Sequence, residues 1–473
     1  MMIKKATVAG RFYPKESSKL KDNVISYLRA TEPLKNKVYG LLVPHAGYVY
    51  SGAIAGAGFS HIKEMDFDTI VFFAAAHTMH VDGAALMKEG FFETPLGQVE
   101  IDSDITQALL KKSKVFEDIS EAHASEHSIE VQLPFLQVIS NKKIKIVPLV
   151  LNTKNLKTLY EAGRAVAEVI KDKKTLICIS SDLSHYPTGD TATKTDLAIM
   201  KALRMAVKSG DLSYFDLANK LVLSKARYEM DTAACGESAI IAGATACMQL
   251  GADDFKLLRY MHSGKISGDD SNVVGYGAGV FIENENKASG ASEFSEDDKE
   301  HLLHYARQSI AYNLKNKKEM SMPLSDIPEF NVPAAVFVTL TENGSLRGCI
   351  GIMEARETLL DSIINFAGAA AFEDHRFAPL TEEELNDIKI EISILSPMVK
   401  VESYKDIEEG KHGVLIRKGR SSGTYLPQVW KHFKTRDEFL SSLCAEKAGL
   451  PALAWKEKST DIYVYTVDSF EEK

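Results

Sequence analysis

Short apolar runs separated by polar segments dominate the first part of the chain. The runs that resemble buried strands are Val38 to Val43, Thr69 to Phe73, Ile144 to Leu151 and Thr175 to Ile179. Their length and their β-branched and aromatic residues are typical of strands buried on both faces. Apolar residues three or four positions apart predict a helix between them, as in Leu156 to Ile170. Alternating strands and helices predict an α/β sheet covered by helices on both faces.

The pattern changes in the second part of the chain. Ala334 to Thr341 and Ser345 to Ile350 flank Glu342-Asn343-Gly344, and Asn-Gly between two such runs is a strong hairpin signal. Ile388 to Ile394 alternates apolar and polar residues, which predicts a strand. Hairpins mixed with helices, such as one over Thr358 to Phe372, predict an α+β domain.

A polar segment without apolar periodicity separates these two parts, and we interpret it as a linker. Ser295 to Asp298 then caps a new amphipathic helix. At 473 residues the chain is longer than one ordinary domain. The predicted organisation is a first domain over residues 1–283, a linker over residues 284–294 and a second domain over residues 295–473.

Charge and composition exclude several kinds of partner. The net charge is -9, and no block of lysine and arginine offers a stripe for phosphates, which argues against nucleic acid. The N-terminus lacks the apolar core of a signal peptide, and no apolar run is long enough to span a bilayer. The 5 cysteines are widely spread and show neither zinc-site nor disulfide spacing. We therefore expect a cytoplasmic protein without a membrane partner.

Polar residues directly follow three of the predicted strands. Pro44 cannot donate a hydrogen bond to a sheet ladder, so the first strand should end there and place His45 at its carboxyl edge. His77 follows the second strand, and Asp182 and His185 follow the fourth. Ligands of open α/β sheets lie just outside the carboxyl ends of the strands. These residues therefore predict one convergent polar site.

His45, His77 and Cys235 are candidate metal ligands. Neutral imidazole and thiolate suit Fe, Cu or Zn, and three protein ligands leave a position open for substrate or water. The alternative is that each is an ordinary loop or core residue, because single-residue matches are common and free cysteine is often buried. The presence of Asp182 and His185 nearby favours a site.

Two further groups are candidates for moving protons. Asp182 and His185 supply a carboxylate and an imidazole three residues apart, which suits acid–base work or a carboxylate that orients a histidine. The alternative is that Asp182 caps a helix and His185 is solvated. His127, with its neighbours Glu126 and Glu130, is a second candidate acid or base; its alternative is a capped, solvated helix start.

Arg347 and Cys349 are the candidates in the second domain. They are two residues apart on a predicted strand, so they should share a face. One interpretation is a reactive, anion-binding cysteine whose thiolate is favoured by the guanidinium. The alternative is a buried cysteine in a glycine-tight hairpin.

Several of the stretches in the first domain resemble the Memo family (mediator of ErbB-driven motility). They are Ala9 to Tyr13, Val43 to Tyr48, Glu126 to Glu130, Ser180 to Tyr186 and Cys235-Gly236. That family is similar in fold to the class III extradiol dioxygenases, which use non-haem Fe(II). The resemblance implies metal ligation by His45, His77 and Cys235, with Asp182 and His185 lining the same pocket. Ala75-Ala76 stands where the family usually has Gly-Pro.

The second domain resembles the AMMECR domain. The matching stretches are Leu346 to Gly351, Phe377 to Leu380, Ile390 to Pro397 and Leu426 to Val429. Asp374-His375-Arg376-Phe377 stands where such domains usually carry Asp-Pro-Arg-Phe. The two families occur together with a radical S-adenosylmethionine protein in the AmmeMemoRadiSam system, so the resemblance implies such a protein as a partner.

Two functions are consistent with these residues. The first is a metal-dependent, dioxygenase-like redox enzyme that acts on an unknown small molecule, with Fe(II) as the expected metal and Cu or Zn as alternatives. In it His185 or His127 would move protons and Asp182 would orient. A thiolate in place of the usual carboxylate of a facial triad favours the softer metals Cu(I) or Zn. The second is a non-catalytic protein that binds a ligand or peptide, with the AMMECR-like half as an interaction module.

Overall fold

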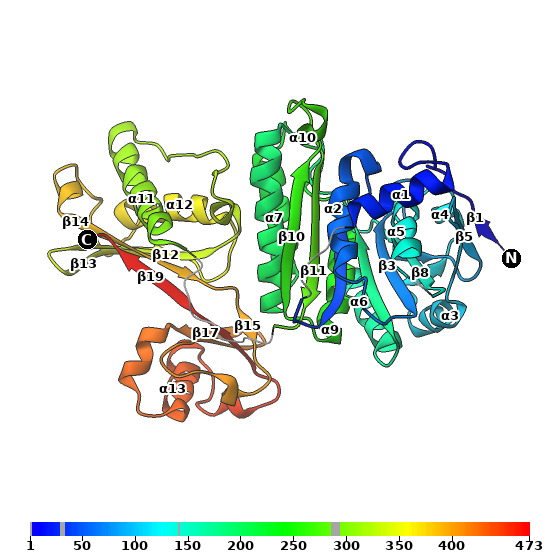
Figure 1. The fold of residues 1–473 in the computed structure, drawn as a ribbon. Helices are drawn as coiled ribbons and strands as arrows, with labels where there is room; N and C mark the ends of the chain where they lie inside the picture. The colour runs from blue at the N-terminus through cyan, green and yellow to red at the C-terminus, as the bar shows by residue number, and fades with distance from the viewer. Residues whose placement is uncertain (1, 29–33, 141, 285–293) are drawn as a thin grey trace. The chain divides into compact units, whose positions relative to one another are not determined.

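The computed structural model describes residues 2–28, 34–140, 142–284 and 294–473. The chain divides into two compact units, Met1–Lys208 with Leu212–Lys287, and Ser209–Asp211 with Ala288–Lys473 (Figure 1). Nearly all of the predicted linker, residues 284–294, lies outside the described residues. Within the described ranges, no helix has the length and apolar character needed to cross a membrane.

The first unit is built on an eight-stranded sheet with the order β10-β11-β2-β9-β3-β8-β4-β7. Its four central strands, β2, β9, β3 and β8, run parallel, so their carboxyl ends meet at one edge. In chain order the strands of this sheet are β2 (Val38–Val43), β3 (Thr69–Ala75), β4 (Ala84–Leu86), β7 (Phe116–Asp118), β8 (Lys145–Leu151), β9 (Thr175–Ser180), β10 (Asp254–His262) and β11 (Gly275–Ile282). A small second sheet contains β1 (Ile3–Lys4), β5 (Phe91–Thr94) and β6 (Gly97–Glu100).

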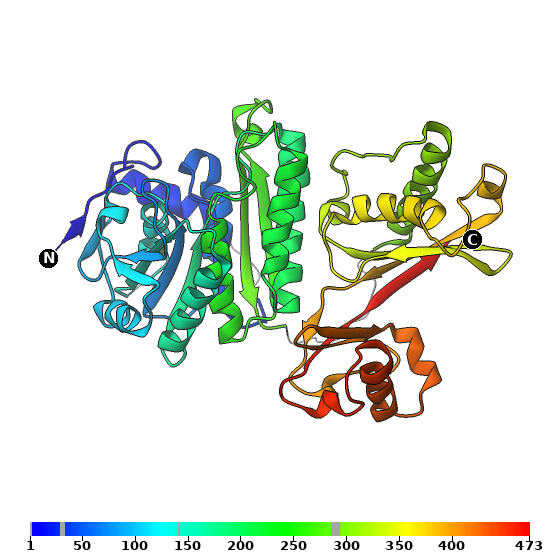
Figure 2. The same cartoon turned by 180° about the vertical axis from the view of Figure 1, so that it is seen from behind.

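Helices cover both faces of the large sheet (Figures 1 and 2). On one face, Phe59 of α2 and Phe135 of α5 stack with ring centroids 5.0 Å apart and share a core with Phe72 of β3. On the other face, α9 comes so close that a Cβ on Gly243 would lie 2.4 Å from the Ile179 side chain. The predicted α/β sheet between two helical layers is therefore confirmed.

The helices of the first unit are mostly the connections between these strands. They are α1 (Ser17–Tyr27), α2 (Tyr48–Ser60), α3 (Ser103–Lys112), α4 (Glu121–Ala124), η1 (Glu130–Gln132), α5 (Leu133–Ile139), α6 (Leu156–Ile170), α7 (Gly189–Ser209), α8 (Ser213–Lys225), α9 (Glu237–Leu250) and α10 (Gly264–Ser267).

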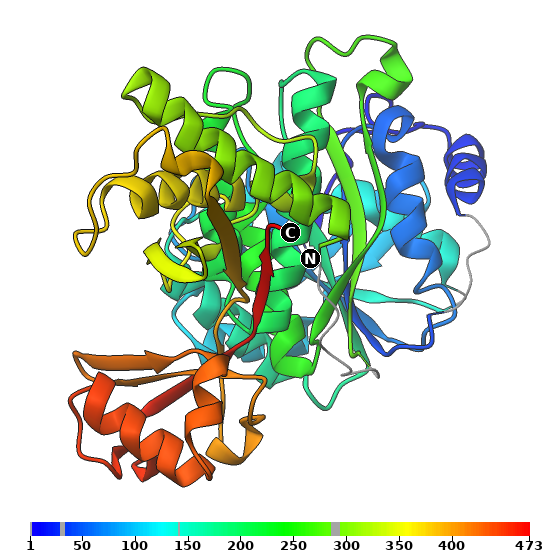
Figure 3. The same cartoon turned by 90° about the vertical axis from the view of Figure 1, so that its left-hand side faces the viewer.

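The second unit contains two antiparallel four-stranded sheets. The strand β19 near the C-terminus is the red arrow beside the label C in Figure 3. The first has the order β13-β12-β14-β19 and packs against α11 (Glu296–Asn316) and α12 (Leu359–Phe372). The second has the order β15-β18-β16-β17 and packs against α13 (Arg436–Ser442). In chain order the strands are β12 (Ala335–Glu342), β13 (Ser345–Gly351), β14 (Ile388–Leu395), β15 (Val399–Lys400), β16 (Gly413–Lys418), β17 (Ser421–Tyr425), β18 (Asp461–Tyr465) and β19 (Val467–Glu471).

The predicted Asn-Gly hairpin forms between β12 and β13. Asn343 and Gly344 have φ values of 50° and 77°, the left-handed conformation that this two-residue turn requires. Together with the helices, this hairpin makes the second unit the expected α+β domain.

A buried carboxylate fixes the segment that follows β9 in the first unit. Asp196 of α7 accepts hydrogen bonds from the backbone N–H of Ser184 at 2.9 Å and from the hydroxyl of Tyr260 at 2.8 Å. The same segment pairs with β11, because the N–H of Leu183 donates to the carbonyl of Gly275 at 2.8 Å. Burial raises the pKa of Asp196 to about 7.

We predict that Asp196→Asn changes how the stability of the first unit depends on pH. The unfolded carboxyl ionises near pH 4 and the folded one near 7, so wild-type stability falls as the pH rises through this interval. Asparagine does not ionise, so the stability of the variant relative to wild type should improve by about 1 kcal/mol or more between pH 5 and pH 8. Urea unfolding of both proteins at the two pH values measures this, and a constant difference would contradict it.

Candidate metal centre

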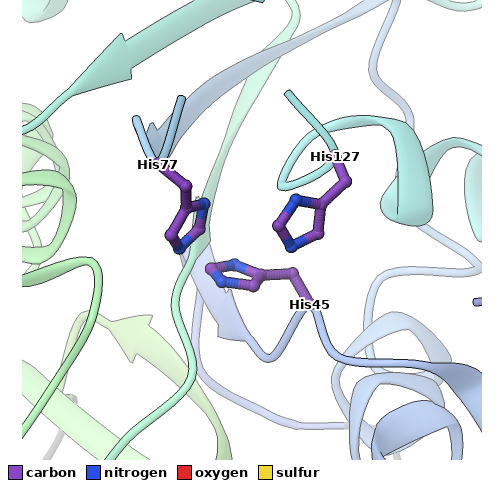
Figure 4. A group of neighbouring side chains, drawn as sticks. All are labelled: His45, His77 and His127. Carbon is purple, nitrogen blue, oxygen red and sulfur yellow. The ribbon is translucent and has the colours of Figure 1, made fainter. Parts of the chain in front are cut away.

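Three histidines from different parts of the chain converge at the carboxyl edge of the large sheet. His45 follows β2, His77 follows β3, and His127 lies between α4 and η1. One ligand nitrogen of each lies within 4.8 Å of the others. Figure 4 shows the rings of His77 and His127 side by side above the ring of His45. His45 is buried with 2% of its surface exposed, whereas the His77 and His127 side chains are 31% and 21% exposed.

The carboxylate of Glu126 holds two of these histidines. It accepts hydrogen bonds from the backbone N–H of His77 at 2.6 Å and from that of His127 at 2.8 Å. The His77 ring contacts it as well, with Nδ1 3.0 Å from Oε1, and the corresponding distance for the ring of His127 is 3.3 Å. Because Nδ1 of His77 is engaged in this way, Nε2 is the nitrogen left to bind a metal.

The protonation of the histidines follows from burial and from Glu126. Burial and the neighbouring imidazoles lower the pKa of His45 well below its usual value, and burial also lowers the pKa of His127. Burial acts in the same direction on His77, but the hydrogen bond and the charge of Glu126 outweigh it and raise the pKa of His77. Neutral imidazole is the form that binds a metal ion, so His45 and His127 have the required form near neutral pH.

Every second residue from 126 to 132 has a buried polar side chain that ties the site together. Ser128 donates to the carbonyl of Ala75, at the end of β3, at 2.8 Å. Gln132 donates to the carbonyl of Pro44 at 2.8 Å and to the hydroxyl of Ser180 at 2.9 Å. The segment therefore connects the ends of β2, β3 and β9, the strands that precede the site residues.

Glu130 ties the N-terminal segment to the same place. Its donors, all near the N-terminus, are the ammonium of Lys4, the backbone and hydroxyl of Thr7, the backbone of Val8 and the hydroxyl of Tyr13. Phe12, which precedes Tyr13 in the chain, packs edge-on against the ring of His127 with centroids 4.9 Å apart. Residues near the N-terminus thus form one wall of the site.

Cys235 lies beside His45. Its Sγ is 3.2 Å from Nε2 of His45, and its backbone N–H donates to the carbonyl of Asp182 at 3.2 Å. Burial and the nearby Asp182 carboxyl raise the pKa of the Cys235 thiol. Among the described residues, the group whose ligand atoms all lie within 4.8 Å of one another contains His127 and not Cys235. The structure therefore places His127 and Cys235 beside the other two predicted ligands, His45 and His77. The residue that forms the tight group with these two histidines is His127, which the sequence predicts as an acid or base.

Asp182 and His185 lie on the non-helical segment after β9, so neither caps a helix. Asp182 accepts a hydrogen bond from the backbone N–H of His45 at 2.7 Å, and burial raises the pKa of its carboxyl to about 7. Burial and the nearby His77 lower the pKa of His185. Its Nε2 is buried and, within the described ranges, has no hydrogen-bond partner. A buried nitrogen without a partner is a place where a ligand group or water can bind.

The two candidates in the second unit have other partners. Arg347 forms a two-point ion pair with Glu384, with N–O distances of 2.9 and 3.2 Å. The thiol of Cys349 accepts a hydrogen bond from the hydroxyl of Thr339 at 3.2 Å, and its backbone N–H donates to Asp374 at 2.9 Å. The charge of Arg347 is therefore paired with a carboxylate 37 residues away in sequence.

The donor set of the first unit fits a transition metal. Imidazole and thiolate suit Fe, Cu and Zn. The contact of the His77 ring with a buried carboxylate is the arrangement that metal-binding histidines usually have. The residues present thus form a possible metal site.

The chain matches two known families. Residues 4–280 match the family model described as Memo-like protein, and residues 303–470 match the model described as AMMECR1. A MEMO1 family protein of Nitrosopumilus maritimus is 35% identical over 288 residues, which cover 59% of this chain and 100% of that protein. The MEMO1 family protein MK0963 of Methanopyrus kandleri is 34% identical over 292 residues, with coverages of 59% and 99%.

Two solved structures are similar to parts of the chain. The crystal structure of uncharacterized protein PH0010 from Pyrococcus horikoshii has 35% sequence identity and a TM-score of 0.33, and the match covers 37% of this chain and 91% of that one. The crystal structure of uncharacterized protein JW3007 from Escherichia coli K12 has 11% identity and a TM-score of 0.35, with coverages of 51% and 99%.

We predict that Glu126→Gln both destabilises the first unit and lowers the pKa of His77. The amide keeps the shape of the carboxylate but loses its charge and one acceptor oxygen, so unfolding should become easier by ~1–3 kcal/mol. The imidazolium of His77 loses the charge that favours it. Urea unfolding and NMR titration of the imidazole nitrogens in metal-free protein measure the two effects. Glu121→Gln, an exposed change five residues earlier, is the matched control and should alter neither.

Proposed function

The chain belongs to the Memo-like protein family, and from that premise we propose that its first unit is an Fe(II)-dependent oxidoreductase that acts on a small molecule. The second, AMMECR1-like part is a module fused to it. The observation that carries the proposal is the convergence of His45, His77 and His127, with Cys235 beside them, at the carboxyl edge of a parallel sheet.

His45 and His77 would hold the metal, and the third protein ligand would come from His127 or Cys235. His45 is fixed for this role by its backbone hydrogen bond to Asp182 and by the contact of its Nδ1 with the hydroxyl of Ser180 at 3.1 Å. When bound, Fe(II) would supply open coordination positions and the capacity to exchange electrons. The resemblance to class III extradiol dioxygenases supports Fe(II) over metals without redox chemistry.

Two residues next to the histidines are suited to move protons. Asp182, whose pKa is raised to about 7, can exist in both protonation states near neutral pH. His185 presents a buried Nε2 without a partner, and its lowered pKa leaves that imidazole neutral and able to accept a proton. Phe12 packs edge-on against the ring of His127 and so borders the site on one side.

We predict that protein purified without oxygen contains close to one iron per chain and that His77→Ala removes most of it, because the variant lacks a ligand shared by both possible ligand sets. Elemental analysis measures the metal content. His80→Ala is the matched control, since His80 lies three residues later on the same loop with an exposed side chain.

The control variant should keep its iron, and both proteins should show the same far-UV circular dichroism. If wild-type protein holds no metal, even after Fe(II) is added under anaerobic conditions, the proposed function is contradicted. A pocket that binds a ligand without turnover would then be favoured. Oxygen uptake by the iron-loaded protein then serves to screen small-molecule substrates.

A further inference from the structure

A loop near the end of the first unit is bonded to the segment that carries His185. This loop runs between α10 and β11, and α10 lies beside one end of α7 (Figure 1). The N–H of Tyr186 donates to the carbonyl of Val273 at 2.7 Å, and the N–H of Gly189, the first residue of α7, donates to the carbonyl of Asp270 at 2.8 Å. The loop therefore sets the position of the segment after β9 that ends at α7.

The backbone of Tyr186 shows that this segment is held against strain. Its φ is 72°, in the left-handed region that a bulky residue rarely adopts. Its side chain is 55% exposed, so packing of the ring does not compensate for the strain. A conformation of this kind persists only where the surroundings fix it, and the loop supplies two of the bonds that do so. A shift of the loop would therefore reach Tyr186 and the His185 before it.

A histidine and an aspartate face each other under this loop across a small gap. His262 is the last residue of β10, and its side chain is 3% exposed. Its Nδ1 is buried and has no hydrogen-bond partner within the described ranges. Oδ1 of Asp270 lies 3.6 Å from this nitrogen, beyond the length of a hydrogen bond. The Asp270 side chain is 58% exposed, so its carboxylate is in contact with water.

Two glycines leave the room that this pair occupies. A Cβ on Gly264 would lie 2.0 Å from Oδ1 of Asp270 and 3.0 Å from Nδ1 of His262. A Cβ on Gly189 would lie 3.0 Å from the carboxylate of Asp270 and 2.9 Å from Cε1 of His262. Neither glycine has a φ in the left-handed region, so the backbone does not require glycine at either position. Both positions are therefore small because the histidine and the aspartate need the space.

The charges around His262 determine when its ring carries a proton. Burial lowers the pKa of His262 below its usual value, the Asp270 carboxylate acts against this, and the ammonium of Lys265 on α10 adds to it. The ring is therefore neutral near neutral pH and becomes protonated in acid. The other titratable groups on the elements packed around it have partners of their own: Tyr260 of β10 with Asp196 of α7, Asp190 with Lys194 in α7, and Asp269 with the backbone of Ser271 in the loop.

We propose that His262 is a positioning residue that acts through Asp270 as a latch: a proton on His262 draws the Asp270 carboxylate in and tightens the loop on the segment of His185 and Tyr186. A neutral ring leaves the carboxylate to water, whereas an imidazolium forms a charge-assisted hydrogen bond of about 2.8 Å, which closes the gap by about 0.8 Å. The latch is thus open near neutral pH and closes as the pH falls. Neither latch residue is a candidate metal ligand, so the inference holds whether or not the first unit binds a metal.

The test compares backbone hydrogen exchange at pH 5 and pH 8 in the full-length chain and its variants. Mass spectrometry follows the peptide over residues 183–190, with labelling times scaled to the intrinsic exchange rate at each pH. NMR titration of protein labelled at its histidine nitrogens measures the pKa of His262. The variants are His262→Gln and Asp270→Asn. The matched control is His80→Gln, because His80 also contacts an aspartate, Asp82, but on the exposed surface.

The expected result is a pH dependence that both latch variants lose. In wild type, the protection of this peptide should be ~3-fold higher at pH 5 than at pH 8, the size expected of a partly exposed ion pair. His262→Gln and Asp270→Asn should match wild type at pH 8 and show no rise at pH 5. The pKa of His262 should fall in Asp270→Asn, because the carboxylate that favours the imidazolium is gone. His80→Gln should behave like wild type at both pH values.

Three other patterns overturn the inference. Equal protection of the wild-type peptide at both pH values would show that no latch closes. Variants that lose the same protection at pH 5 and pH 8 would show a structural support that does not depend on the proton. A rise at pH 5 that persists in Asp270→Asn would show that the proton acts through another group. Circular dichroism checks the folding of each variant, and His262→Asn replaces His262→Gln if that variant fails to fold. The iron content of the same samples bears only on the proposed function.

Discussion

The contact between the carboxylate of Glu126 and the two histidines beside it is the interaction on which the candidate site depends. Glu126 is buried, and burial alone would raise the pKa of its carboxyl. The hydrogen bonds from His77 and the backbone of Ser128 reverse this effect and hold the pKa well below its usual range. The group is therefore an ionised carboxylate inside the protein, and it stays so only while the donors around it stay in place. The orientation of the histidines and the ionisation of the Glu126 carboxylate therefore depend on each other.

The same constraint explains why the neighbouring positions are polar. A buried charge is tolerated when the surrounding backbone is fixed, and Ser128, Glu130 and Gln132 fix it by bonding to three other segments. A partly satisfied network of this kind would cost more than an apolar core. Substitution at any of these positions should therefore affect the histidines, because the segment contains His127 and is bonded to the ends of β2 and β3.

The four parallel strands at the centre of the large sheet can be predicted from the sequence alone, because they depend on local signals. The short strands β4, β5, β6 and β7 and the edge strand β10 cannot. Pro44 ends β2, and the apolar runs have the length of buried strands. The position of His127 beside the other two histidines is harder to predict, because it depends on where the segment after α4 lies relative to β2 and β3. Alternating polar residues at 126–132 usually indicate a solvated face, whereas here the polar side chains point inward. Arg347 shows the same limit: its partner, Glu384, is set by tertiary packing rather than by its spacing from Cys349.

Two buried aspartates show why geometry, and not pKa alone, identifies a site in this protein. Burial raises the pKa of Asp182 and of Asp196 to about 7 in both cases. Asp196 meets a backbone N–H and the hydroxyl of Tyr260, and it holds the segment after β9 in place. Asp182 meets the backbone of His45 and lies beside Cys235, so its proton is within reach of the candidate ligands. Burial therefore raises the pKa of a carboxyl that supports the scaffold in one case and of a carboxyl beside the candidate metal centre in the other.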